Sequence, residues 1–281
     1  MPPTQKLAQA KSLCLSDCIK GSTHVPPKIV IYGRPAIGKT ITAAQADAPF
    51  FMLSPGETGL HTLMDSGQLR NDIPNIEVGT WADYMGLLEE LQTKPHKAQT
   101  LIVDTVSGME PLANNHVRQQ DFRGDSGPKD FQAYMAGYRA VAMGAWKESL
   151  AALDRIRVLR KMLIVLLAHT GTQKVANPSG GDYSKWAPAF AGHWAWDITY
   201  GWADAVLFAD YDLAVSKDRE KDPKGKASSS GTRWLYADWS PDYDAKNRFA
   251  MPAAIEMGTK PQEAWQKISQ YITNNTTKEQ E

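Results

Sequence analysis

One short stretch of the chain combines the residue types that bind phosphate. The sequence GRPAIGKT, residues 33–40, has Gly33 and Gly38 flanking four residues, with Lys39 and Thr40 directly after. Glycines let a loop turn its N–H groups toward phosphate oxygens, a lysine reaches the terminal phosphates, and a hydroxyl ligates Mg²⁺. The spacing predicts a P-loop that binds ATP with Mg²⁺ through Gly33, Arg34, Pro35, Ala36, Ile37, Gly38, Lys39, Thr40 and Ile41.

A second candidate residue ends the apolar run TLIVDT, residues 100–105. If this run is a buried parallel strand, Asp104 lies at its carboxyl end, beside the P-loop. A carboxylate there can hold Mg²⁺ through a water molecule. The alternative is an aspartate that caps the next helix.

Two further polar residues follow apolar runs. Glu57, in FFMLSPGETGL, could orient and deprotonate an attacking water. A glutamate is equally expected in the first turn of a helix, where it stabilises the helix dipole. His169 ends the run MLIVLLAHT and could sense a terminal phosphate, or simply cap a buried strand.

These residues need a sheet to bring them together, and the apolar pattern predicts one. Six short runs rich in Val, Ile, Leu or Phe are typical of strands buried on both faces, namely residues 29–32, 50–53, 76–78, 101–103, 163–167 and 205–208. Helices are expected from residue 40, over 81–92 and within 131–161. Alternating strands and helices predict a doubly wound, mostly parallel α/β sheet.

The pattern changes after residue 208. Two alternating segments flank a charged stretch rich in Gly, Ser and Pro at 217–231, which predicts an antiparallel hairpin with a disordered tip. The expected organisation is an N-terminal arm (1–27), a core (28–258), and a C-terminal helix with a polar tail (259–281).

Composition narrows the classes of partner. Formal net charge is zero, so nucleic acid would have to be bound by a local patch. No apolar run is long enough to span a bilayer, and the first residues do not form a secretory signal. Cys14 and Cys18 are interpreted as reduced thiols of a cytoplasmic protein.

The order of these features resembles the RecA-type ATPase core over about residues 28–258. The segment AKNRFAMP (245–252) resembles a stretch whose two cations reach a neighbouring subunit's ATP in that family. Residues 180–210 resemble phage-encoded minimal RecA-like ATPases that act in annealing and strand exchange. The resemblance implies that Glu57 is the catalytic base, that His169 replaces a phosphate-sensing glutamine, and that Lys246 and Arg248 act in trans.

The resemblance also implies that two loops face DNA. These are residues 107–130, with Arg118 and Arg123, and residues 171–194. Cations interleaved with aromatic rings suit single-stranded DNA. The second loop contributes Lys174, Tyr183, Lys185 and Trp186, although each aromatic ring could instead pack in the core.

The expected protein is a DNA-stimulated ATPase of a phage, working in the bacterial host cytoplasm. It would assemble with itself as a head-to-tail filament or ring on single-stranded DNA, with a single-stranded-DNA-binding protein as a further candidate partner. A helicase or packaging motor on the same core is the first alternative. A regulatory or scaffolding nucleotide-binding protein is the second, and a metabolic kinase the third.

Overall fold

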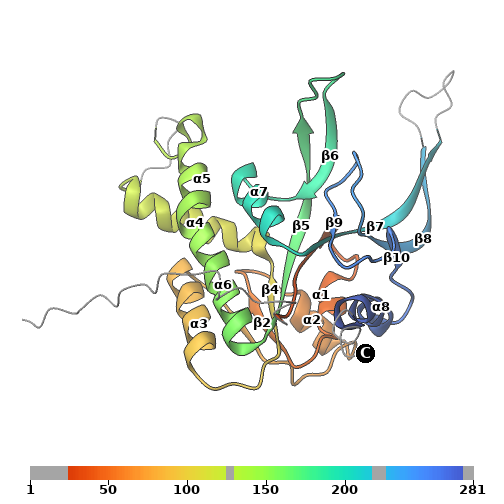
Figure 1. Cartoon of the computed structure of the whole chain (residues 1–281), viewed down its shortest axis with the longest axis horizontal. Coiled ribbons are helices and arrows are strands. Elements are labelled where there is room, and N and C mark those ends of the chain that lie inside the picture. The colour runs from red at the N-terminus through yellow and green to blue at the C-terminus, as the bar shows by residue number, and fades with distance from the viewer. Residues whose placement is uncertain (1–24, 125–129, 217–225, 275–281) are drawn as a thin grey trace, which may run out of the picture.

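A mostly parallel sheet with helices on both faces forms the body of the protein (Figure 1). The computed structural model describes residues 25–124, 130–216 and 226–274. The strands within these ranges are β1 (Lys28–Gly33), β2 (Pro49–Leu53), β3 (Asn75–Glu77), β4 (Thr100–Asp104), β5 (Leu163–Val175), β6 (Tyr183–Pro188), β7 (Ala205–Ser216), β8 (Lys226–Tyr236), β9 (Lys246–Asn247) and β10 (Ala254–Glu256).

The strand order is β3-β2-β4-β5-β1-β7-β8-β10. All pairs from β3 to β7 are parallel, and they include the six strands predicted from apolar runs. From β7 onward the pairing is antiparallel, with β8 on β7 and β10 on β8, while β9 pairs with the start of β7. The predicted fold class, a parallel α/β sheet with a C-terminal antiparallel hairpin, is confirmed.

Helices connect the strands and cover both faces of the sheet. They are α1 (Lys39–Ala43), α2 (Gly59–Asp65), α3 (Trp81–Thr93), α4 (Val106–Asp121), the 3₁₀ turn η2 (Ala133–Met135), α5 (Ala136–Val141), the π-helical turn η3 (Ala142–Trp146), α6 (Lys147–Arg160), α7 (His193–Trp202) and α8 (Pro261–Asn274). None of the helices in the described ranges has the length and apolar character of a membrane span.

Alternation along β1 divides the core into two layers. Val30 and Tyr32 pack with the apolar sides of α3, α4, α6 and α7. Ile29 and Ile31 point to the other face and pack with α1, α2 and α8. All four side chains have no exposed surface, as expected for a strand in the middle of a covered parallel sheet.

The strand register brings the polar ends of the strands to one edge. Gly33 of β1 pairs with His169 of β5, and Asp104 of β4 pairs with Leu167 of β5. Leu53 of β2 pairs with Asp104, and Glu57 follows it after a short turn. The P-loop, Asp104, Glu57 and His169 therefore all start from the same edge.

Two pairs of strands extend beyond this edge (Figure 1). β5 continues past His169 and pairs with β6, forming what we call the β5–β6 hairpin. β7 and β8 form the second pair, with a bulge between Tyr211 and Leu213. Residues 226–231, predicted as part of a disordered tip, belong to β8 because they complete the ladder with β7; residues 217–225 lie outside the described part of the chain.

Three other expectations fall on residues that are not described. These are most of the N-terminal arm, both cysteines, and the polar tail after residue 274. The C-terminal helix is confirmed as α8, in which Trp265 and Ile268 are buried against the core layer that contains α1.

The close packing of α4 on β2 gives a stability prediction. A Cβ on Gly108 would lie 2.1 Å from the Ser54 hydroxyl oxygen, whereas a Cβ on Gly86 of α3 would meet no atom within 4 Å. Alanine at both positions gains helix propensity, but only Gly108→Ala must also displace a buried side chain. In urea denaturation, Gly86→Ala should stabilise by about 0.5–1 kcal/mol and Gly108→Ala should destabilise by about 1–3 kcal/mol. Equal stabilisation by both substitutions would contradict this packing.

Candidate active site

The loop after β1 has the geometry that a phosphate cradle requires. Gly38 has φ of 108°, a left-handed conformation that favours glycine. Gly33 is equally constrained, because a Cβ there would lie 2.1 Å from the Ala209 carbonyl oxygen. The structure therefore explains both glycines of the predicted P-loop by backbone conformation and close approach.

Lys39 occupies the inside of this loop. Its Nζ donates to the carbonyl oxygens of Gly33 at 3.0 Å and Arg34 at 2.9 Å. Burial lowers the pKa of Lys39, while the charges of Asp104 and Glu57 raise it. Neutral carbonyl oxygens thus hold the ammonium at the loop. Phosphate oxygens are charged, so they would form stronger hydrogen bonds with this ammonium and displace the carbonyls.

Thr40 and Asp104 meet beside the lysine. The Thr40 hydroxyl donates to Asp104 Oδ2 at 2.8 Å, and the Asp104 side chain is almost completely buried. Burial raises the pKa of this carboxyl to about 6, against the hydrogen bond from Thr40, which lowers it. One carboxylate beside one hydroxyl and a phosphate-binding loop is the donor set that Mg²⁺ usually takes in nucleotide sites. The predicted pair of metal ligands is therefore placed together.

Glu57 and His169 lie in contact at the same edge. Glu57 Oε2 is 3.4 Å from His169 Nε2, and the two groups are half-buried. The hydrogen bond from His169 is the main cause that holds the pKa of Glu57 below its usual value. The other ring nitrogen, His169 Nδ1, is buried and has no hydrogen-bond partner among the described residues.

The main chain of His169 ties this pair to the neighbouring elements. Its N–H donates to the Ser107 hydroxyl of α4 at 3.2 Å. Its carbonyl accepts from Ala189 N, just after β6, at 2.8 Å. A displacement of His169 would therefore disturb its hydrogen bonds with both segments that were predicted to face DNA.

Two arginines have contacts at the P-loop, and only one of them, Arg34, was part of the predicted sequence motif. Arg34 lies 2.7 Å from the Asp210 carboxylate, through Nε. Arg233 of β8 donates to Ile37 O at 3.4 Å and Gly258 O at 2.8 Å, on the outer side of the loop. Asp210 follows a predicted apolar strand just as Asp104 does, so the same signal was present there. Nothing local marks Arg233, because only the β7–β8 pairing brings it to the loop.

Lys246 and Arg248 lie away from these residues. β9 pairs with Ala205 and Val206 at the start of β7, whereas the P-loop strand reaches Ala209. Lys246 Nζ donates to the carbonyls of Tyr200 at 2.8 Å and Gly201 at 3.0 Å, near the end of α7. Arg248 pairs with Asp204 at 3.1 Å. The structure does not bring either cation to the P-loop of its own chain.

The first predicted DNA-facing loop is wrong in its secondary structure. Residues 106–121 form α4, whose N-terminus is capped by the Thr105 hydroxyl accepting from Gly108 N. Arg118 lies in the last turn and donates to Asn115, while Arg123 is exposed just after the helix. The polar composition that was interpreted as a loop belongs to the outer side of this helix. DNA contact by these two arginines stays a prediction.

The second predicted loop is also ordered differently, as the β5–β6 hairpin followed by α7. In the register, Thr172 lies opposite Trp186 and Lys174 opposite Ser184. Since side chains alternate between faces, Lys174 and Trp186 share one face, and Tyr183 and Lys185 the other. The four predicted DNA contacts are therefore divided between two surfaces.

Two of these four side chains are engaged within the chain. Lys185 Nζ lies 2.6 Å from Asp244 Oδ1, and Asp244 is buried. The ring of Trp186 is covered by the Arg34 guanidinium at 4.9 Å from its centroid. Lys174 is exposed, and Tyr183 is half-buried. Of the predicted set on this hairpin, Lys174 is the freest to meet a ligand.

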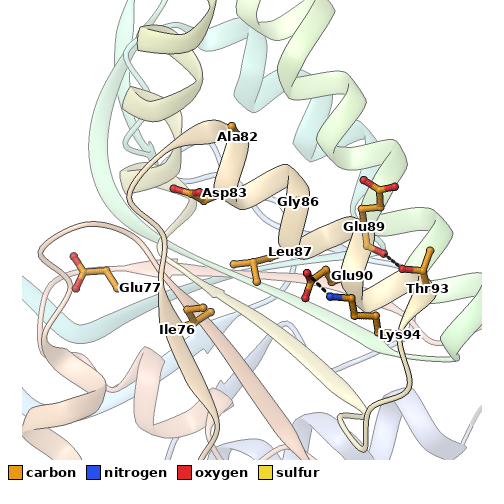
Figure 2. A pocket seen from close by; sticks show the side chains of 10 residues that line it. All are labelled: Ile76, Glu77, Ala82, Asp83, Gly86, Leu87, Glu89, Glu90, Thr93 and Lys94. Carbon is orange, nitrogen blue, oxygen red and sulfur yellow. Dashed lines mark hydrogen bonds and ion pairs between the residues drawn. The ribbon is translucent and has the colours of Figure 1, made fainter.

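A cavity of about 610 Å³ lies elsewhere, between the edge strand β3 and α3 (Figure 2). Its lining includes Glu77, Asp83, Glu89 and Glu90, and none of the P-loop residues. Four carboxylates against one lysine, Lys94, would repel a triphosphate. This cavity therefore does not suit a nucleotide, and the predicted site stays at the strand ends.

Two comparisons with known proteins gave matches. A family model described as an AAA domain matches residues 25–249. A solved structure described as the crystal structure of the RadB recombinase superposes with a TM-score of 0.40 and 12% identity, over 74% of this chain and 88% of that chain. No curated protein sequence matches this chain.

The buried Asp104 gives a prediction about pH. Its pKa in the folded protein, about 6, lies above the ordinary value of 3.8, so folding favours the protonated form. The associated stability is complete below the ordinary value and is lost as the pH rises through about 6, on the order of 3 kcal/mol in all. Asp104→Asn should therefore raise the melting temperature without nucleotide more at about pH 8 than at about pH 5.

The same substitution should abolish the Mg²⁺ dependence of nucleotide binding, because an amide is a poor replacement for a carboxylate ligand. In the wild type this dependence should weaken below about pH 6, where Asp104 becomes protonated. Thermal denaturation and nucleotide titration measure the two effects. A stability difference that does not change with pH would show that the burial of the charge is not the cause.

Proposed function

The chain belongs to the AAA domain family, and we propose that it is an ATP-driven recombinase that binds single-stranded DNA and promotes annealing or strand exchange. The P-loop, with its lysine, threonine and nearby aspartate, supports nucleotide binding. The resemblance of the sequence to phage-encoded minimal RecA-like ATPases supports the recombination role and a place in a bacterial host cytoplasm.

One observation carries the DNA half of this proposal. β5 runs without a break from the buried core, through His169, into the β5–β6 hairpin that leaves the sheet. The residue that contacts Glu57 thus belongs to the same strand as exposed Lys174. A strand shared between the two places is a rigid connection, so movement at His169 is passed to the hairpin without an intervening joint.

The residues have separate roles in hydrolysis. Lys39 would hold the terminal phosphates of ATP, whose phosphoryl group is transferred to water. Thr40 and Asp104 would hold Mg²⁺, which would supply positive charge beside the phosphate oxygens. Glu57 orients the attacking water and accepts its proton.

The Glu57–His169 contact describes a resting arrangement. A carboxylate that accepts a hydrogen bond from a histidine has a lowered pKa and is a weaker base. Activation requires the two side chains to separate, and His169 can then turn toward a phosphate oxygen. DNA on the hairpin would favour one of these two arrangements.

Assembly completes the site in this proposal. Lys246 and Arg248 cannot serve their own P-loop, so they would serve the next subunit, in a head-to-tail filament or ring. Weak contacts with DNA would add along many subunits, which suits a chain with no net charge. A single-stranded-DNA-binding protein is a further proposed partner.

ATP turnover measured with and without oligo(dT), with electron microscopy of the same samples, tests the proposal. Single-stranded DNA should raise turnover and produce a filament or ring. Glu57→Gln serves as the control, because it should retain nucleotide binding and assembly while losing turnover. If DNA changes neither turnover nor assembly, the recombinase proposal fails; slow turnover indifferent to DNA indicates a regulatory or scaffolding protein, and duplex unwinding by a ring indicates a motor.

The trans-acting cations have their own test. Arg248→Ala should reduce turnover of the assembled protein by about a thousandfold, the effect of removing an arginine that stabilises phosphoryl transfer. Nucleotide binding by the monomer should be unchanged, since Arg248 pairs with Asp204 just before β7, whereas the P-loop follows Gly33, which pairs with Ala209. Lys267→Ala is the control for the loss of one cationic side chain, since Lys267 lies on α8 and donates to Glu256 O at 2.7 Å. Equal loss of monomer binding in Arg248→Ala would place this residue in cis and exclude the trans role.

A further inference from the structure

Arg34, the second residue of the P-loop, has three sets of contacts that leave the loop in different directions. Its carbonyl accepts from Lys39 Nζ at 2.9 Å. Its Nε lies 2.7 Å from Asp210 Oδ1 on β7. Its guanidinium lies over the ring of Trp186 on β6, 4.9 Å from the centroid. One residue therefore joins the phosphate-binding lysine to both strand pairs that extend from the sheet.

The contact with Asp210 fixes the side chain of Arg34. Asp210 is 5% exposed, and its carboxylate also accepts from Tyr211 N at 2.8 Å. The Arg34 side chain is partly exposed, but its removal would leave the buried Asp210 carboxylate without a cationic partner, which is unfavourable. The guanidinium therefore keeps its place while the backbone of the loop adjusts around it.

The contact with Trp186 reaches the base of the β5–β6 hairpin. A guanidinium over an indole ring within about 6 Å is a cation–π interaction. The main chain of Trp186 is also attached to β1, because the Tyr32 hydroxyl donates to Trp186 O at 3.2 Å. Trp186 N donates to Asp242 O at 2.7 Å, and Trp186 O accepts from Asp244 N at 3.1 Å, both in the segment between β8 and β9. A displacement of Trp186 would therefore also displace the base of the β5–β6 hairpin.

Lys39 connects these contacts to the nucleotide. In the structure its ammonium is shared between two carbonyls of the loop, one of which belongs to Arg34. Bound phosphates would compete for the same ammonium, since charged acceptors form stronger hydrogen bonds than neutral ones. The Arg34 carbonyl would lose its partner, and the peptide unit of this residue would be free to reorient.

We propose that Arg34 is the positioning residue that links occupancy of the nucleotide site to the β5–β6 hairpin, through its cation–π contact with Trp186 and its ion pair with Asp210. The DNA half of this inference rests on the proposed function. Linkage is reciprocal, so a hairpin held by DNA must change nucleotide affinity by the factor by which nucleotide changes DNA affinity.

The link assigns Trp186 a different task from the one predicted. One face of its ring is occupied by Arg34, so this face is not available for stacking on bases. In this inference the position of the ring depends on the conformation of the P-loop. DNA contact is left to the outer part of the hairpin, where Lys174 is exposed.

The first experiment needs no DNA. Protein labelled with 5-fluorotryptophan gives a fluorine resonance for Trp186, assigned by its disappearance in Trp186→Phe. Saturating Mg²⁺ and ATPγS should move this resonance in the wild type. The movement should be largely lost in Asp210→Asn, which releases the guanidinium. It should persist in Asp212→Asn, the same substitution at an exposed position of the same strand. An unmoved resonance in the wild type, or the same movement in Asp210→Asn, overturns the link.

The second experiment measures coupling. The affinity for labelled oligo(dT) is compared with and without ATPγS, and the ratio is expected to be about tenfold in the wild type and in Asp212→Asn. It should fall to about twofold or less in Asp210→Asn and in Trp186→Leu, which removes the ring without touching a charge, while Trp186→Phe should restore most of it. If Asp210→Asn does not fold, the two Trp186 variants decide the matter.

The outcomes separate the two levels of the argument. A wild-type ratio that is kept in Trp186→Leu shows that coupling exists but does not pass through Arg34, which overturns the inference and leaves the proposed function intact. If the wild type does not bind oligo(dT) in any state, the proposed function fails, and the fluorine experiment still decides whether the P-loop moves the hairpin base.

Discussion

The alignment of β5 between β1 and β4 is the constraint on which the site depends. β5 pairs with both neighbours in parallel register, so that Gly33 lies beside His169 and Asp104 beside Leu167. A one-residue slip of either pair would reverse the faces of its side chains and destroy both core layers. The apolar residues that fill those layers thus also place the P-loop, the Asp104 carboxylate and His169 at one edge.

This edge concentrates charge where little water remains. Lys39 and Asp104 are both buried. Burial lowers the pKa of Lys39 and raises the pKa of Asp104, so it favours the neutral form of each group. Neither group is placed there for stability, because the opposite charges of Lys39 and Asp104 offset only part of the penalty of burying them. The large covered sheet tolerates that cost, and in the proposed function it holds the charged groups in position for phosphates and a cation.

Local pattern was sufficient for part of this site. Runs of consecutive apolar residues identified all six parallel strands, and the spacing of Gly33, Gly38 and Lys39 identified the loop. The sequence placed Glu57 and His169 separately near strand ends; their contact was not predicted, and His169 lies within β5, which continues to Val175. For the strands and the loop, the physical cause lies within a few residues of the feature, so a short window of sequence contains it.

Where the cause was distant, the sequence misled. Residues 107–121 and 171–175 carry polar side chains and were expected to be loops, although one continues as a helix and the other as a strand beyond the core. Their outer surfaces face solvent, so composition could not distinguish order from disorder. The partners of Lys185 and Trp186 are Asp244 and Arg34, which lie 59 and 152 positions away in the chain. No local signal reports such pairs.

The placement of β9 beside the start of β7, away from the P-loop of the same chain, has a consequence for any assembly joined through these surfaces. A row of such subunits would have two different ends. At one end a P-loop would have no β9 from a neighbour against it, and at the other end a β9 would have no neighbouring P-loop to contact. The ends would then gain and lose subunits at different rates, because only one of them adds a subunit that completes an existing nucleotide site. Direction along DNA would follow from the geometry of a single chain.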